Sequence, residues 1–297
     1  MLAELAATHG AIRRTFDEAS AVLGYDLWQL VQEGPAEELN RTDRTQPAML
    51  AADVAIWRLW RELGGPMPAV MAGHSLGEYA ALVCAESLDF GRAVMLVAER
   101  GRFMQEAVPS GQGAMAAVLG LDDEQVRAVC AAAAQGEVVA AVNFNSPGQV
   151  VIAGNAAAVE RAIGLAKEAG AKRAIPLPVS VPSHCELMRP AARRMAELLE
   201  ATEFAAPAVP VLHNADVRSW TDAAAIRDAL VRQLYSPVRW VESVQAMAAL
   251  GARTMVEFGP GKVLSGLAKR IDRDMAAVCV QDPASLDEAL ASARGAA

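Results

Sequence analysis

The chain has 297 residues, a formal net charge of −8 and a hydrophobic content of 53%. This length can bury a large core and lies near the size at which one domain divides into two. No apolar stretch reaches the ~18 to 20 residues of a membrane span, and the average negative charge disfavours nucleic acid. The first residues lack the features of an export signal. We therefore expect a cytoplasmic protein that binds neither membrane nor nucleic acid.

Scattered cysteines argue against both a metal site and a disulfide framework. The four thiols, Cys84, Cys130, Cys185 and Cys279, form no CxxC pair and no Cys/His ligand spacing. Cys185 follows His184 directly, but side chains of adjacent residues rarely converge as a nucleophile and its base. We expect reduced thiols, no metal, and a packing role for Cys185.

The first third of the chain alternates helical and strand-like patterns. Apolar residues from Leu2 to Ala19 recur at spacings of three and four, which predicts an amphipathic helix. Pro47 is expected to open a second helix that stops at Gly64. Further predicted elements are a strand at 69–72, a helix at 78–85, and a helix from the N-cap Asp89 to about 108.

The middle of the chain follows a different order of elements, beginning after a stretch rich in turn residues at 109–113. We expect strands at 114–119, 138–142, 150–153 and 171–177, helices at 122–134 and 156–169, and a turn at 143–148. The order β-α-β-β-α-β is that of a ferredoxin-like module. The sequence therefore predicts an inserted subdomain at 109–179.

Helix–strand alternation resumes after residue 180. The predicted helices are 187–199, 224–234, 238–250 and 263–271, and the predicted strands are 209–212, 255–258 and 277–280, with 255–258 buried. This pattern favours an α/β fold with a mostly parallel sheet. We expect one core, at 1–108 and 180–297, with a substrate site between it and the inserted subdomain.

One motif carries the strongest chemical signal. Gly73-His74-Ser75-Leu76-Gly77 lies between a predicted strand and a predicted helix, which is the context of a nucleophile elbow. A serine on such a sharp turn has a strained backbone, and glycines on both sides would avoid clashes. We interpret Ser75 as a nucleophile, with a helix-capping turn serine as the alternative.

A serine nucleophile needs a base, and the chain has only four histidines. His74 is the neighbour of Ser75 and is expected to point elsewhere. His9 lies on a helix stripe and His213 at a strand end, where packing or surface roles are usual. His184 follows two prolines at the junction between the expected core and the inserted subdomain. Its spacing alone only slightly favours it as the base.

Three segments together resemble the bacterial malonyl-CoA:acyl carrier protein transacylase family. They are Gly73-His74-Ser75-Leu76-Gly77-Glu78-Tyr79, Val181-Pro182-Ser183-His184 and Asn143-Phe144-Asn145-Ser146-Pro147-Gly148, and the resemblance covers essentially the whole chain. It implies an α/β-hydrolase-like core on which a serine–histidine dyad moves malonyl from coenzyme A to the phosphopantetheine thiol of acyl carrier protein. No bound cofactor is implied.

The resemblance also implies a role for several residues. Ser75 would be the nucleophile, His184 the base, and the backbone carbonyl of Gln233 the group that orients the histidine. Arg100 would bind the free carboxylate of malonate with its planar fork. Substrate-site positions are further implied for Gln46, His74, Asn143 and Asn145, and the backbone N–H of Leu76 is expected to serve the oxyanion.

One part of the family pattern is missing. The resemblance implies a strand and a Gly-Gln-Gly-Ser-Gln loop before the helix that begins here at Leu2, with the loop glutamine as second oxyanion donor. This sequence contains neither. We therefore hypothesise that Met1 is an internal methionine of a longer protein, or that the chain is truncated, and we do not expect full activity of this sequence as it stands.

The sequence thus favours a malonyl transacylase of fatty-acid synthesis with malonyl-CoA and acyl carrier protein as partners. A serine esterase or thioesterase is the first alternative, because the elbow alone permits it. A carrier-docking protein without catalysis is the second. Formation of a free acid would favour the former, and binding without an acyl-serine the latter.

Overall fold

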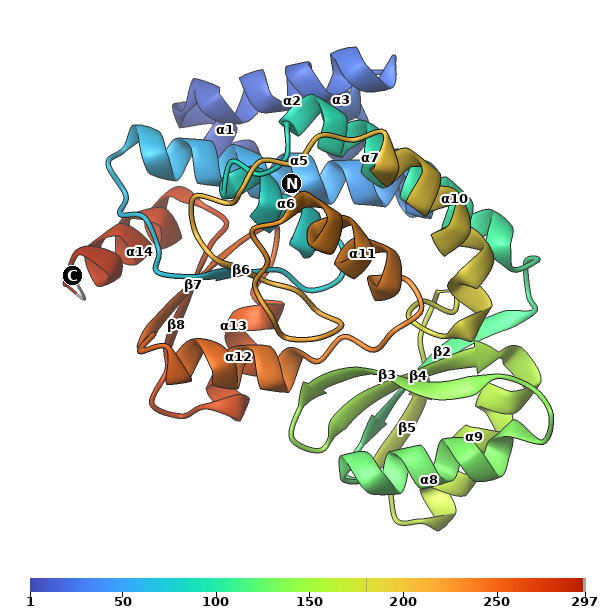
Figure 1. Ribbon diagram of the computed structural model, residues 1–297. Coiled ribbons are helices and arrows are strands. Elements are labelled where there is room, and N and C mark those ends of the chain that lie inside the picture. The colour runs from blue at the N-terminus through green and yellow to red at the C-terminus, as the bar shows by residue number, and fades with distance from the viewer. Residues whose placement is uncertain (180, 296–297) are drawn as a thin grey trace.

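A computed structural model describes residues 1–179 and 181–295 as an α/β protein in which helices surround short sheets (Figure 1). The expected domain boundary at residue 180 lies outside the described residues. The helices are α1 Ala3–Thr8, α2 Gly10–Leu23, α3 Leu27–Glu33, α4 Ala36–Leu39, α5 Thr42–Glu62, α6 Gly77–Cys84, α7 Phe90–Ala107, α8 Asp123–Ala134, α9 Ala156–Glu168, the 3₁₀ turn Glu186–Met188, α10 Arg189–Glu200, α11 Ala223–Gln233, α12 Trp240–Ala249, α13 Val263–Ile271 and α14 Pro283–Gly295. None of these helices is long and apolar enough to cross a membrane.

Parallel strands form two separate pairs. β1 (Met71–Ala72) pairs with β6 (Val211–Leu212), and β7 (Thr254–Phe258) pairs with β8 (Ala276–Val280). The expected parallel pairing is therefore confirmed for these strands, but within the described residues they form two separate pairs and not one sheet. β7 is also half-buried along its length, not buried as expected.

The other strands build a four-stranded antiparallel sheet in the order β3-β4-β2-β5. Their bounds are β2 Gly113–Leu119, β3 Val139–Ser146, β4 Gln149–Asn155 and β5 Arg173–Pro176. Helices α8 and α9 pack on one face around their own apolar cluster (Figure 1). The other face packs against Cys185, so it meets the segment that carries His184.

Strand β3 is longer than the sequence predicted. The turn expected at 143–148 is wrong for 143–146, which belong to the strand. The physical reason is a tertiary contact, since Phe144 N–H donates to the Val238 carbonyl at 3.0 Å and Val238 N–H to the Val142 carbonyl at 2.8 Å. These bonds join the end of β3, which contains Asn143 and Asn145, to the segment around Val238 outside the four-stranded sheet.

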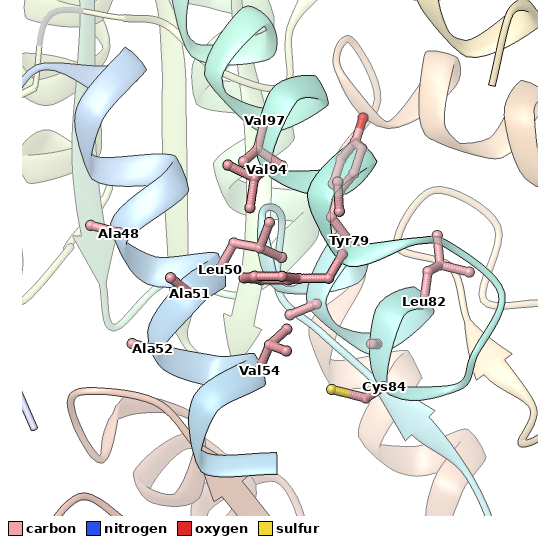
Figure 2. Packing of buried hydrophobic residues seen from close by; sticks show 14 of the residues in the cluster. Ala48, Leu50, Ala51, Ala52, Val54, Tyr79, Leu82, Cys84, Val94 and Val97 are labelled. Atoms are coloured by element: carbon pink, nitrogen blue, oxygen red, sulfur yellow. The ribbon is translucent and has the colours of Figure 1, made fainter. Parts of the chain in front are cut away.

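The main core packs around α5, from which Leu50 and Val54 point toward buried side chains of α6 and α7 (Figure 2). A Cβ on Gly101 of α7 would lie 2.5 Å from the Thr42 carbonyl oxygen, so the crossing of α5 and α7 requires glycine.

The expected helix start at Pro47 is wrong. The helix begins at Thr42 and carries Pro47 inside it, at the loss of one backbone hydrogen bond.

Remaining differences concern helix boundaries. The single helix expected from Leu2 to Ala19 is divided at His9, whose backbone is extended. Helices α3, α4 and α14 were not predicted. The N-cap Asp89 is confirmed. Asp122, expected as the first residue of a helix, is the N-cap of α8 and forms a full capping box.

Candidate active site

Ser75 lies on a sharp turn between β1 and α6. Its φ of 54° is in the left-handed region, where a residue other than glycine is strained. A Cβ on Gly73 would lie 1.9 Å from the carbonyl carbon of Gly77, so the turn closes only with glycine at position 73. A Cβ on Gly77 would meet open space, so the expectation that both glycines avoid clashes is wrong for Gly77.

The structure brings Ser75 and His184 together. Ser75 Oγ lies 2.7 Å from His184 Nε2, and His184 Nδ1 lies 2.8 Å from the Gln233 backbone oxygen. This pairing fits an Nδ1–H tautomer that donates to the carbonyl and leaves Nε2 free to accept the serine proton. His184 also has a left-handed backbone, with φ of 64°.

Burial and a neighbouring cation keep His184 neutral. Desolvation and the Arg100 charge lower the pKa of His184 to about 3, although its hydrogen bond to Gln233 acts in the opposite direction. A neutral imidazole can accept a proton from Ser75, whereas an imidazolium cannot. The site is therefore in its base form throughout the neutral pH range.

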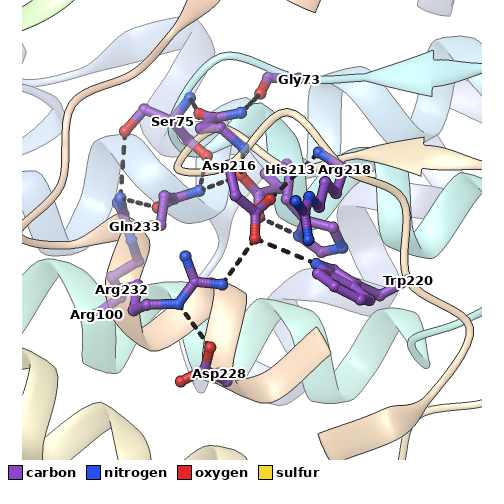
Figure 3. Close-up of polar contacts among 12 residues, drawn as sticks. Gly73, Ser75, Arg100, His213, Asp216, Arg218, Trp220, Asp228, Arg232 and Gln233 are labelled. Carbon is purple, nitrogen blue, oxygen red and sulfur yellow. Dashed lines mark hydrogen bonds and ion pairs between the residues drawn. The ribbon is translucent and has the colours of Figure 1, made fainter. Parts of the chain in front are cut away.

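Arg100 is a buried cation whose donors contact neutral oxygens. Nη1 donates to Gln46 Oε1 at 2.7 Å. Nη2 donates to Gln233 Oε1 at 2.9 Å and to Ser75 Oγ at 3.2 Å (Figure 3). Its Nε has no partner, and no carboxylate of the described residues lies within ion-pair distance. Burial lowers the pKa of Arg100, which Tyr79 and Glu78 partly oppose. An anionic ligand would relieve this unpaired charge.

The remaining predicted residues lie around this centre to differing degrees. His74 Nε2 lies 2.9 Å from Asn145 Oδ1 and its ring lies 5.6 Å from the Trp240 ring, so this pair joins β3 to the elbow. Burial lowers the pKa of His74. Asn143 Oδ1 is buried without a partner in the described structure. Leu76, at the N-terminal cap of α6, donates its N–H to no acceptor within residues 1–179 and 181–295.

A second group of polar residues, not identified from the sequence, lies behind the turn that carries Ser75. Asn214 Oδ1 accepts from Ser75 N–H at 2.6 Å, and Asn214 Nδ2 donates to the Gly73 carbonyl at 2.7 Å. Glu78 and His213 lie behind Asn214, and both are fully buried. Their position in the sequence could have indicated this role. Residues 213 and 214 follow a short parallel strand, at the same sheet edge where β1 ends before Ser75.

The cysteine alternative has no support in the geometry. Cys185 Sγ donates to the Pro182 carbonyl at 3.1 Å, and burial raises the pKa of this thiol to about 11. The reactive thiolate is therefore disfavoured. Among the described residues, no group of three His, Cys, Asp or Glu side chains could hold a metal ion.

Comparisons with known proteins place the chain in a family. The acyl transferase domain family matches residues 1–280. A malonyl CoA-acyl carrier protein transacylase from Salmonella typhimurium is 61% identical over 98% of this chain and 94% of its own. Among solved structures, an acyl carrier protein S-malonyltransferase from Vibrio cholerae is 62% identical with a TM-score of 0.95, over 97% of this chain and 94% of that one.

A further solved structure shows a malonyl-transacylase in complex with a type II PKS acyl-carrier protein. It is 58% identical to this chain with a TM-score of 0.97, and the match covers 98% of this chain and 94% of the other. These relatives confirm the resemblance identified from the sequence. The protein belongs to the acyl transferase domain family, among the malonyl CoA-acyl carrier protein transacylases.

Proposed function

We propose that this protein transfers the malonyl group from malonyl-CoA to the phosphopantetheine thiol of acyl carrier protein, through an acyl-serine on Ser75. The relatives' names supply the substrates and the reaction class. The complex of a similar transacylase with its carrier supports acyl carrier protein as the partner. None of these names supports the esterase alternative.

The first half-reaction makes the acyl-enzyme. Ser75 Oγ attacks the thioester carbonyl while His184 Nε2 takes the hydroxyl proton, and Gln233 holds the imidazole through its carbonyl. The Leu76 N–H at the start of α6 stabilises the oxyanion, where loss of one donor typically slows the reaction ~100- to 1,000-fold. The C–S bond breaks, and coenzyme A leaves as a thiol with the proton from His184.

The second half-reaction reverses these roles. The carrier's thiol gives its proton to His184 and attacks the acyl-serine carbonyl, again through an oxyanion at the Leu76 N–H. The C–O bond to Ser75 then breaks, and Ser75 regains the proton from His184. All proton and bond changes are accounted for by these groups and the two thiols, so the proposal includes no resident cofactor.

Arg100 is the residue that supports malonyl transfer in particular, as distinct from acyl transfer in general. Its guanidinium lies 3.2 Å from the attacking Oγ, is buried, and has no carboxylate partner in the described part of the chain. The free carboxylate of a malonyl group would meet this charge when its thioester carbonyl lies at Ser75. An acetyl group offers no such charge, so the site favours malonyl.

In this proposal the other predicted residues line the substrate site or hold Arg100 in place. Gln46 holds one end of the Arg100 fork, and His74 with Asn145 lines the side toward the four-stranded sheet. Asn143 lies two residues from Asn145 on β3 and has an unpaired buried oxygen that a ligand donor could satisfy.

The architecture fits an insertion between two halves of a catalytic core. We propose that 1–108 and 180–297 form an α/β-hydrolase-like core and that 109–179 forms a ferredoxin-like subdomain. The strand order β3-β4-β2-β5, the two helices on one face and a separate apolar cluster support the subdomain.

Product analysis tests the proposed function. The protein is mixed with malonyl-CoA and carrier bearing the phosphopantetheine arm, with carrier lacking the arm as control. The expected product is malonyl-carrier, with no transfer to the control. Free malonate as the main product would instead identify an esterase, and carrier binding without turnover would identify a docking protein.

A further inference from the structure

The carboxylate of Glu78 is a fully buried charge that the proposed acyl transfer does not use. It lies in the first turn of α6, three residues after Ser75. Its Oε1 accepts from His213 Nδ1 at 2.6 Å, and its Oε2 accepts from Asn214 N–H and Gln233 Nε2, each at 2.9 Å. A buried carboxylate with three donors is a firm anchor for the groups that supply them.

Two of these three partners hold the strained backbone of the nucleophile. Asn214 bonds to Ser75 N–H through Oδ1 and to the Gly73 carbonyl through Nδ2, so it spans the turn. Gln233 Nε2 also donates to the Ser75 carbonyl at 2.9 Å. The left-handed φ of Ser75 is therefore maintained by side chains that Glu78 holds in place.

The charge on Glu78 also decides which way the Gln233 amide points. With Nε2 on the carboxylate, Oε1 faces Arg100 Nη2 at 2.9 Å. The reversed amide would set its oxygen against the Glu78 carboxylate and its NH₂ against a guanidinium, which is repulsive at both ends. Glu78 and Arg100 thus lie at opposite ends of one amide, and Gln233 connects the malonyl-binding cation to the base-orienting carbonyl.

We propose that Glu78 is a positioning residue for malonyl transfer, acting through Gln233 on Arg100 and through Asn214 on Ser75, with His213 holding the carboxylate from behind. The proposal rests on the proposed function. It differs from a purely structural role because it requires Glu78 to affect the choice between malonyl and acetyl groups, which is a property of Arg100.

The test measures kcat/KM for malonyl-CoA and acetyl-CoA in wild type and in Glu78→Gln, which keeps the shape of the side chain but removes its charge. The expected result is a loss of the malonyl-to-acetyl ratio of about 10- to 100-fold, because misplacement by ~1 Å can cost ~100-fold in rate. His213→Leu leaves Oε1 unpaired and should lower the same ratio by a smaller factor. It also keeps the proposal testable if Glu78→Gln does not fold.

Asp222→Ala is the matched structural control. Asp222 caps the other end of α11, the helix that ends at Gln233, by accepting from Ala225 N–H at 3.0 Å. This variant should lower the melting temperature and leave the ratio unchanged. A second control places Glu78→Gln in an Arg100→Ala background, where it should change the ratio less than about threefold, because coupled residues are not additive.

The outcomes separate the two proposals. If wild type transfers no malonyl group, the proposed function fails. If wild type is active and both Glu78→Gln and His213→Leu keep the wild-type ratio, the positioning role of Glu78 is wrong. An undiminished effect of Glu78→Gln without Arg100 would also overturn the proposal.

Discussion

Replacement of Arg100 by alanine should convert the protein from a malonyl-selective to an unselective acyltransferase. Arg100 is 1% exposed, and its donors contact only neutral oxygens in the described structure. Removing one partner of a buried, hydrogen-bonded charge pair typically costs about 2 to 5 kcal/mol. At 1.36 kcal/mol per factor of ten, this corresponds to roughly 30- to 5,000-fold in kcat/KM for malonyl-CoA.

Acetyl-CoA provides the internal control for this prediction. Its acyl group has no carboxylate, so Arg100→Ala should leave acetyl transfer unchanged or faster. Arg100→Lys should be intermediate, since one ammonium cannot reach both Gln46 and Gln233 as the two ends of the guanidinium do. The assay is initial-rate transfer to carrier at matched folded fractions, checked by thermal unfolding. Equal losses with both substrates would refute the carboxylate-binding role.

Two further predictions concern the base and the turn. Because burial and Arg100 lower the pKa of His184 to about 3, the base form persists as pH falls, so kcat/KM should show no ionisation near pH 6.5. In Arg100→Ala, assayed with acetyl-CoA, the acid limb should move to higher pH; a wild-type limb with its midpoint near 6.5 would contradict this. Gly73→Ala should destabilise the fold by about 1 to 3 kcal/mol or more and abolish transfer, because its Cβ would meet the Gly77 backbone at 1.9 Å. Gly77→Ala, whose Cβ meets no atom, should remain folded and active. Denaturant unfolding of the two variants measures the difference in their stability.

Much of the site could be predicted from local sequence because its chemistry is concentrated in short motifs. The elbow around Ser75 combines glycines, a strand and a helix within a few residues. Arg100 and His184 required the family resemblance, since a helix arginine or a loop histidine alone is ambiguous. Asn214 gave no motif, because its role depends on the parallel pairing of β1 with β6.

Errors in the predicted fold also trace to tertiary contacts. The residues after Val142 have strong turn composition, yet β3 continues because Val238 supplies backbone partners. Pro47 is a good first helical residue by composition, but the helix starts earlier, where Thr42 packs under Gly101. Helix α14 was missed although Pro283 follows Asp282 and apolar residues recur at 286, 289 and 290, a pattern that the sequence did contain.

Locating the acyl group on the protein tests the central claim most directly. The protein is mixed briefly with malonyl-CoA, quenched in acid and digested, and the modified peptide is sequenced by mass spectrometry. We predict malonate on Ser75 in wild type, its loss in Ser75→Ala, and its removal from wild type when carrier thiol is added before the quench. Malonate on Cys185, or transfer to the carrier with no acyl group on Ser75 at any time, would contradict the account.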